Sequence, residues 1–174
     1  MYEHNFLQKR YNQTIKFLKS VVSPPAYILD LDVENPLSEI MKNQGYKVDN
    51  TKGEDLDIQP EAVASEAYDV ITGFEILEHL VSPSNVLREI RAKQLVITVP
   101  SSLWFARAYR NKNDPWDRHF HEFEDWQFDW LLEKSGWKIR KTEKWTALVK
   151  KIGFRPILRL FTPRYYAIYA TKDN

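Results

Sequence analysis

Short apolar runs that alternate with amphipathic helical segments constrain the fold of this chain more than any other feature of its sequence. The runs cover Ala26 to Val33, Tyr68 to Thr72 and Gln94 to Val99. Helical patterns lie between them, one from Pro36 to Gly45 and one that begins near Pro83. Strands that alternate with helices imply right-handed crossovers and a mainly parallel sheet covered on both sides. The sequence therefore predicts a doubly wound, Rossmann-like α/β fold with three α/β/α layers.

Further elements are expected at both ends of this alternating core. Apolar residues at three- and four-residue steps predict a leading helix that ends before Pro24. A helix is expected from Glu122 to Ser135, and two closing strands, 137–142 and 165–170, are expected to pair antiparallel at the edge. We expect one domain over 1–174, with a leading helix in 1–22, a core in 26–139 and a basic C-terminal segment in 140–174.

Composition excludes several classes of protein. Without cysteine, the chain has no disulfide and no thiolate metal site, so any metal ion has to be held by His, Asp or Glu. The first twenty residues mix charges with apolar residues and lack the apolar stretch of a signal peptide, which makes a cytoplasmic location the expectation. A net charge of +1 conceals an acidic stretch from Asp30 to Asp69 and a basic one from Lys138 to Arg164.

Ligands of open α/β sheets bind beyond the carboxyl ends of the strands. In this chain those positions are Asp30 to Asn35, Asp55 to Asp57, Phe74 to His79 and Pro100 to Ser102. A dinucleotide-binding dehydrogenase is disfavoured, because its glycine fingerprint is missing after the first strand. A P-loop nucleotide hydrolase is disfavoured because no Gly-x-x-x-x-Gly-Lys occurs.

Five sequence blocks follow one another between Tyr27 and Ile139: ILDLDVENPLSEIMKNQGY, YDVITGFEILEHL, SNVLREI, QLVITVP and HFHEFEDWQFDWLLEKSGWKI. In this order they resemble class I methyltransferases that use S-adenosylmethionine (SAM), especially the branch with a Glu-x-x-Glu-His-Leu block. The resemblance implies a SAM-binding domain that methylates an acceptor.

The cofactor loop departs from the family pattern. In the family the first strand ends in an acid and a Gly-x-Gly-x-Gly turn, which lets the backbone approach the cofactor closely. Asp30 keeps the acid, whereas Asp32, Glu34 and Pro36 occupy the glycine positions. The carboxylates would crowd the methionyl group of SAM and repel its carboxylate, although they suit its cationic sulfonium and amine. The resemblance assigns cofactor contacts to Asp30, Asp32, Glu34, Asn35, Phe74 and Glu75.

The second crossover of the family is also shortened. The segment from Gly45 to Tyr68 is too short for a full helix and strand. The resemblance makes Asp49 a candidate for the acid that binds the ribose hydroxyls. It places Asp55 or Asp57 near the adenine amino group.

A divalent metal site is the sharpest chemical hypothesis. Glu75, Glu78 and His79 stand at i, i+3 and i+4, so on a helical turn their oxygen and imidazole donors project from one face. The pattern resembles the metal-assisted branch of the family, in which two Glu, the adjacent His and a later His hold a divalent ion such as Mg²⁺. Alignment of the 121–124 block favours His121 over His119 as the later His. Alternatively, Glu and His only cap and brace the helix.

Histidines and basic segments supply the remaining candidates. His79, His119 and His121 are possible general bases, or structural residues that only hydrogen-bond their neighbours. Segment 101–119 mixes arginines with aromatics, as an acceptor-binding lid does, or it is a surface excursion with buried Trp anchors. Segment 145–161 is basic and partly amphipathic, which suits nucleic acid or an anionic lipid surface, or a solvated helix face.

Two functions therefore stay open. The first is a SAM-dependent methyltransferase for an unidentified acceptor, with metal-assisted O-methylation as a specific form. The second is a methyltransferase-like protein that has lost SAM and serves as a binding or regulatory module.

Overall fold

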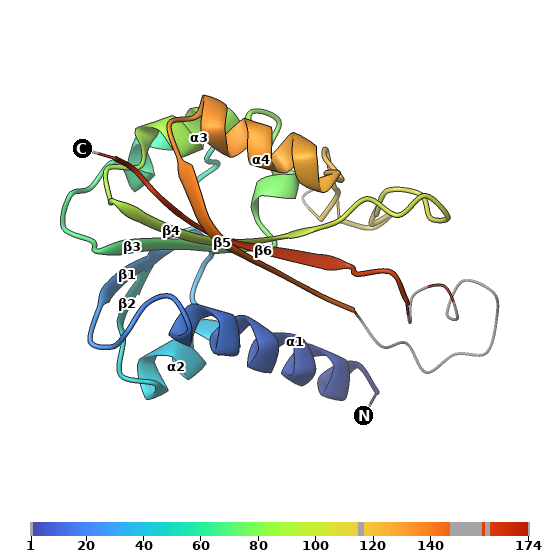
Figure 1. Ribbon diagram of the computed structural model, residues 1–174, viewed down its shortest axis with the longest axis horizontal. Helices are drawn as coiled ribbons and strands as arrows, with labels where there is room; N and C mark the ends of the chain where they lie inside the picture. The colour runs from blue at the N-terminus through green and yellow to red at the C-terminus, as the bar shows by residue number, and fades with distance from the viewer. Residues whose placement is uncertain (1, 115–116, 147–157, 159–160, 174) are drawn as a thin grey trace.

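A six-stranded sheet forms the centre of the molecule (Figure 1). The computed structural model describes residues 2–114, 117–146, 158 and 161–173. The strand order across the sheet is β2-β1-β3-β4-β6-β5. The strands are β1 (Tyr27–Asp30), β2 (Lys47–Asn50), β3 (Val70–Phe74), β4 (Gln94–Pro100), β5 (Lys138–Trp145) and β6 (Tyr165–Thr171).

Four neighbouring strands of this sheet run parallel. β1 pairs in parallel with β2 and β3, and β3 with β4, so that Leu29, Ile71 and Leu95 lie side by side. β6 is antiparallel to both β4 and β5. The predicted mainly parallel sheet with an antiparallel pair at one edge is confirmed. The strand that runs antiparallel to both of its neighbours is β6, and β5 lies next to it at the outer edge of the sheet.

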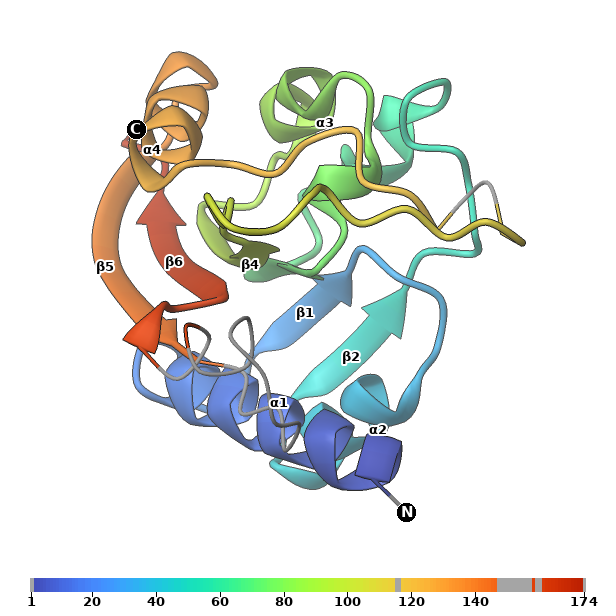
Figure 2. The same ribbon diagram turned by 90° about the vertical axis from the view of Figure 1, so that its right-hand side faces the viewer.

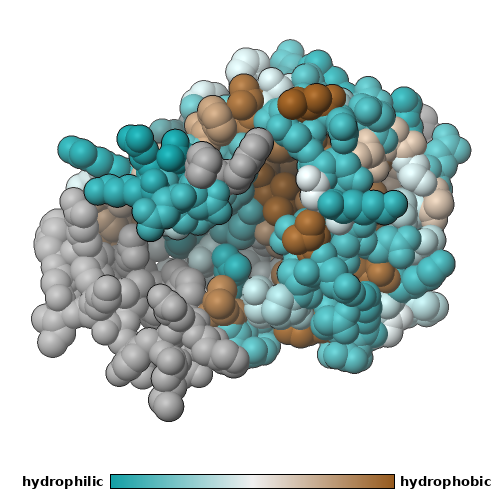
Figure 3. Space-filling model, turned by 180° about the vertical axis from the view of Figure 1, so that it is seen from behind, coloured by the Kyte–Doolittle hydropathy of each residue, from teal (hydrophilic) through white to brown (hydrophobic). Residues whose placement is uncertain are grey.

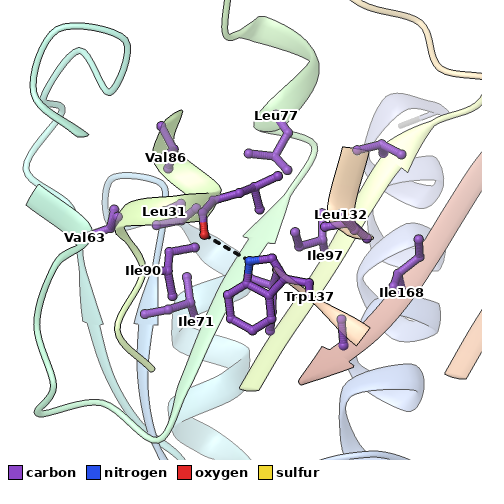
Figure 4. Packing of buried hydrophobic residues seen from close by; sticks show 14 of the residues in the cluster. Leu31, Val63, Ile71, Leu77, Val86, Ile90, Ile97, Leu132, Trp137 and Ile168 are labelled. Carbon is purple, nitrogen blue, oxygen red and sulfur yellow. Dashed lines mark hydrogen bonds between the residues drawn. The ribbon is translucent and has the colours of Figure 1, made fainter. Parts of the chain in front are cut away.

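Helices cover both faces of the sheet (Figure 1). One face carries α1 (Tyr2–Lys19) and α2 (Pro36–Asn43), and the other carries α3 (Pro83–Glu89), α4 (Asp125–Lys134) and the 3₁₀ turns η1 (Pro60–Val63) and η2 (Leu77–His79). Phe17 and Leu18 of α1 are fully buried against the sheet. On the opposite face, the buried Trp137 indole donates a hydrogen bond of 3.0 Å to the Leu87 carbonyl (Figure 4). The three-layer sandwich is therefore confirmed.

The connection from β2 to β3 is short, as expected from the sequence. Among residues 51–69 the only helical element is η1, and no strand is present. Val63 of η1 is fully buried in the core, which anchors the connection to the face that carries α3. β2 consequently forms one edge of the sheet.

A long segment, 101–119, leaves β4 and returns beside η2. Its two arms meet at an isolated antiparallel bridge between Arg110 and Arg118, and the backbone N–H of His119 bonds the Tyr109 carbonyl at 3.2 Å. Figure 2 shows the segment crossing the molecule near the carboxyl end of β1. Its Trp104 is 80% exposed, so this side chain is no buried anchor.

Two further expectations concern the basic C-terminal segment and a membrane-spanning helix. Most of the basic segment 145–161 lies outside them, so its predicted binding role stays a prediction. No helix in the described part of the chain combines the length and apolar character needed to cross a membrane.

Candidate functional site

A cleft of about 750 Å³ opens at the carboxyl ends of β1, β2 and β3. Its walls come from the loops that follow these strands, including Leu31 after β1, Thr51 after β2 and Ile76 after β3. On the face seen in Figure 3, hydrophobic residues are visible inside a hollow that hydrophilic residues surround. The volume is within the range of about 300–1,000 Å³ typical of small-molecule sites.

Side-chain hydrogen bonds fix the loop after β1, at the positions where the family has glycines. Asn35 caps α2 by accepting hydrogen bonds from the backbone N–H groups of Leu37 and Ser38. Asp32 accepts bonds from the Val33 N–H and the Asn35 side chain, and it lines the cleft. Glu34 turns away from the cleft to form an ion pair with Lys42, which lowers the pKa of Glu34. The expected crowding by two carboxylates is therefore reduced to one, that of Asp32.

Asp30 at the end of β1 is buried. Its carboxylate accepts a 2.6 Å hydrogen bond from the Thr72 hydroxyl of β3. Burial raises the pKa of Asp30 to about 7, although Thr72 acts in the opposite direction. A cation placed beside Asp30 would stabilise its ionised form.

The other acids expected in the cofactor cleft have different roles. Asp49 does not line the cleft, and its carboxylate accepts hydrogen bonds from the hydroxyls of Tyr27 and Tyr68, so its expected contact with ribose hydroxyls stays a prediction. Asp57 lines the cleft, but both of its oxygens accept backbone N–H groups, from Val81 and Ser82 at the start of α3. Asp55 also lines the cleft and accepts a bond from the Asp57 N–H.

A small pocket of about 90 Å³ lies beside the cleft, beneath α1. Asp30, Asp32, Phe74 and Glu75 line it from the sheet side, and Arg10 closes it from α1. Phe74 and Glu75 therefore belong to this pocket and not to the larger cleft.

Glu75 does not stand on a helix, so the predicted single helical face of Glu75, Glu78 and His79 is wrong. Glu75 follows β3 with φ of 63°, in the left-handed region, while η2 begins at Leu77. Such a backbone costs about 1–3 kcal/mol for a residue other than glycine and often marks a functional site. Burial raises the pKa of Glu75, and the nearby Arg10 guanidinium opposes the rise.

Glu78 is the most unusual side chain of the site. It is completely buried, and neither carboxylate oxygen has a hydrogen-bond partner among the described residues. Burial, followed by the negative charge of Glu75, raises its pKa well above the usual value. A buried carboxyl group without a hydrogen bond is either neutral, as its raised pKa favours, or ionised beside a cation.

Two imidazoles face this carboxylate. His79 Nε2 lies 3.9 Å and His119 Nε2 lies 4.0 Å from Glu78 Oε1. One ligand atom from each of the three residues fits within 4.8 Å of the others, which is the spacing of a metal-ligand group. His79 also lines the cleft, so the group borders the space described above.

His121 lies outside this group, and the preference for His121 over His119 is wrong on geometry. The His121 ring stacks on Phe123, and its Nε2 is 3.3 Å from the Val81 carbonyl. The chain bends at Phe120, between the two histidines, so that His119 faces Glu78 while His121 faces Phe123, and alignment of neighbouring histidines could not decide between them. Glu75 also lies outside the metal-ligand group of the described residues.

A family model described as a methyltransferase domain matches residues 11–142 of the 174. The chain belongs to this methyltransferase domain family. No protein in a search of curated proteins matches it.

Solved structures share the fold of this methyltransferase domain. One is the 1,6-didemethyltoxoflavin-N1-methyltransferase of Burkholderia thailandensis, with 1,6-didemethyltoxoflavin and S-adenosylhomocysteine bound: TM-score 0.67, 17% identity, 94% of this chain and 78% of that chain covered. An S-adenosylmethionine dependent methyltransferase structure from Listeria monocytogenes gives a TM-score of 0.65 at 14% identity, covering 95% and 99%. The magnesium protoporphyrin IX methyltransferase of Synechocystis gives a TM-score of 0.57 at 10% identity, with 97% of this chain and 84% of that chain covered. At these identities the likeness shows the fold.

The candidate site also contains polar residues that the sequence did not single out. Arg10 reaches the small pocket from α1 and donates a hydrogen bond to the Tyr165 hydroxyl. The spacing of Arg10, Thr14 and Phe17 puts all three on one face of the helix. Thr14 and Phe17 are buried, so this spacing could have indicated that Arg10 also points inward.

Glu122 and Arg164 were also missed. Glu122 Oε1 lies 3.4 Å from His119 Nδ1 and 3.5 Å from Arg164 Nη2. Burial opposes its ionisation, but His119 and the Tyr109 N–H outweigh burial and keep the pKa of Glu122 below its usual value. The i,i+3 spacing from His119 was the available signal for Glu122, whereas nothing in the sequence links Arg164 to it.

Proposed function

We propose that this chain transfers a methyl group from SAM to a hydroxyl group of an acceptor that is bound to a divalent cation. The buried, unpartnered Glu78 carboxylate facing two imidazoles at the cofactor cleft carries this proposal. SAM supplies an electrophilic methyl group. The protein then has to bind and orient both reactants and remove the proton of the acceptor hydroxyl.

The residues of the cleft and the small pocket fit SAM. The loop after β1 has one inward carboxylate, Asp32, and Asp30 and Glu75 add acidic character to the pocket. An ammonium or sulfonium group there would be stabilised, and the Arg10 guanidinium suits a carboxylate. These side chains would replace the missing glycine loop as the binding groups for the methionyl end.

The candidate metal ligands are Glu78, His79 and His119. Two imidazoles and one carboxylate suit a transition-metal ion such as Mn²⁺ or Fe²⁺ better than Mg²⁺, which prefers oxygen ligands. A bound cation would lower the pKa of an acceptor hydroxyl. Burial lowers the pKa of His79, so the neutral imidazole that can ligate a metal or accept a proton is favoured.

Calorimetric titration with S-adenosylhomocysteine, with and without Mn²⁺, tests the proposal. We expect one binding site per chain, and we expect Arg10→Gln to weaken binding by about tenfold through loss of a charge-assisted bond. Glu34→Gln is the matched control and should leave the affinity unchanged, because Glu34 points away from the cleft. Absence of binding under both conditions would refute the proposal.

The same titration decides the second candidate function, a scaffold that has lost the cofactor. The observation in its favour is that Asn35 already satisfies two N–H groups at the start of α2, leaving fewer backbone donors for a ligand. Measurable binding of S-adenosylhomocysteine would eliminate this candidate.

A further prediction concerns Glu122, which we propose orients His119 through Nδ1 so that Nε2 faces Glu78. Removal of such an outer carboxylate typically weakens metal binding by about 10- to 100-fold. We therefore expect Glu122→Ala to lower Mn²⁺ affinity by about that factor, measured by electron paramagnetic resonance. Glu133→Ala is the control, since Glu133 is exposed near the end of α4 and has no ion pair among the described residues. Equal Mn²⁺ affinity in both variants and the wild type would exclude this role.

A further inference from the structure

A second groove, of about 730 Å³, lies between α3 and α4 on the face of the sheet opposite α1. The two helices run side by side above the segment that leads into α4 (Figure 2). The groove shares Val81 and Phe120 with the cofactor cleft, so the two sites are neighbours. Neither the cofactor nor the metal proposal makes use of it.

Exposed aromatic rings line this groove. Trp126 is 59% and Trp130 57% exposed, and one helical turn separates them on α4. Phe120 at the end of the groove is 64% exposed. Exposed large apolar residues that gather around one hollow mark a binding site more often than scattered ones do.

The two indoles are held with ring surface accessible. The Trp126 Nε1–H donates a 2.7 Å hydrogen bond to Glu124 Oε2. The Lys134 ammonium lies 5.7 Å from the centre of the Trp130 ring. Both rings are therefore positioned to stack on a flat partner, at little cost in side-chain entropy.

The charges that line the groove are unbalanced. Lys134 and Arg88 both line it, and the exposed Arg88 side chain has no ion pair among the described residues. Glu122 is the one acid in the lining, and its carboxylate is engaged by Arg164, His119 and the Tyr109 N–H. The groove thus offers aromatic surface and positive charge together.

We propose that this groove binds a flat aromatic molecule that carries an acidic group. The rings of Trp126 and Trp130 would stack on the aromatic part, and Arg88 and Lys134 would pair with the acidic group. The volume suits one small molecule. The positive lining selects an anionic aromatic over a neutral one. This site is independent of the proposed methyl transfer.

The probe for this site is 1-anilinonaphthalene-8-sulfonate, measured by calorimetry. We expect saturable binding of one molecule per chain. Stacking is worth about 1–3 kcal/mol per ring, so the double variant Trp126→Ala/Trp130→Ala should bind at least tenfold more weakly. Trp104→Ala, which removes an exposed indole outside the groove, is the control and should bind as the wild type does.

Charge selection is tested with Arg88→Gln/Lys134→Gln. This variant should bind the sulfonate several-fold more weakly, yet bind the uncharged N-phenyl-1-naphthylamine unchanged. All substituted side chains are exposed, so circular dichroism should report a native fold for every variant. Unaltered sulfonate affinity in either double variant would overturn the proposal. It would also be overturned if sedimentation shows a dimer that Trp126→Ala/Trp130→Ala dissociates, because a second copy would then occupy the groove.

Discussion

Replacing Glu78 by glutamine is expected to abolish metal-assisted methyl transfer and, at the same time, to raise the free energy of unfolding. Activity should fall by at least about 100-fold, the upper end of the losses seen when only an outer-sphere partner of a metal is removed. Stability should rise by about 1 kcal/mol, because the substitution removes an ionisable group that is buried without a partner. A purely structural carboxylate would show the opposite change in stability.

The stability gain from Glu78→Gln should depend on pH in a defined direction. The pKa of the folded-state carboxyl is raised well above 4.5, so the folded protein binds its proton more tightly than the unfolded chain does. The gain is absent below pH 4.5, grows as the pH rises through the interval between the two pKa values, and is complete above the folded pKa.

Urea denaturation of metal-free protein from pH 4 to 8 measures this effect, with methyl transfer assayed separately once an acceptor is found. Glu133→Gln, at an exposed position of α4, is the matched control and should change neither quantity. A loss of stability in Glu78→Gln at neutral pH would contradict a cation site, since it would mean that the carboxylate is already satisfied.

The second large effect is expected at Asp30. Its folded-state pKa is about 7, against 3.8 for a free side chain, and at 1.36 kcal/mol for each pKa unit this corresponds to about 4 kcal/mol. Because the folded pKa is the higher one, the penalty is absent below pH 3.8 and complete above about pH 7. We therefore expect Asp30→Asn to flatten the fall in stability of the protein between these limits.

The comparison is made by urea denaturation at several pH values in this range, with Glu61→Gln on the exposed side of η1 as the control. Asparagine keeps an oxygen that can accept the Thr72 hydroxyl, so the variant should fold. Parallel pH dependences of Asp30→Asn and the wild type would show that the carboxyl ionises without penalty. In the wild type, S-adenosylhomocysteine should lower the pKa of Asp30 and release protons, which calorimetry in buffers of different ionisation enthalpy detects.

The sequence predicts the core of this fold because its signals are local and strong. The apolar runs around Ile28, Ile71 and Val96 became central parallel strands, all three residues being fully buried. The shortened crossover followed from counting residues between two strands. Such features depend on periodicity and length, both of which are readable without tertiary contacts.

The site was harder to predict because it depends on single backbone angles and long-range contacts. The i, i+3, i+4 spacing implied a helix at Glu75, but the chain takes a left-handed turn there, which no propensity for glutamate indicates. The choice between His119 and His121 depended on which ring the returning segment turns inward. Arg10 and Glu78 lie sixty-eight positions apart in sequence, so only the fold brings their elements to one end of the sheet.

β5 lies at the outer edge of the sheet, and this position gives the charged side chains of the strand a role. An outer strand has backbone groups free to pair with another chain, and long uncharged ones invite aggregation. β5 is eight residues long, and five of them are charged: Lys138, Arg140, Lys141, Glu143 and Lys144. The charge of this strand, which precedes the segment 145–161 expected to bind nucleic acid or lipid, therefore has an effect of its own. It keeps neighbouring molecules from adding a strand to this sheet.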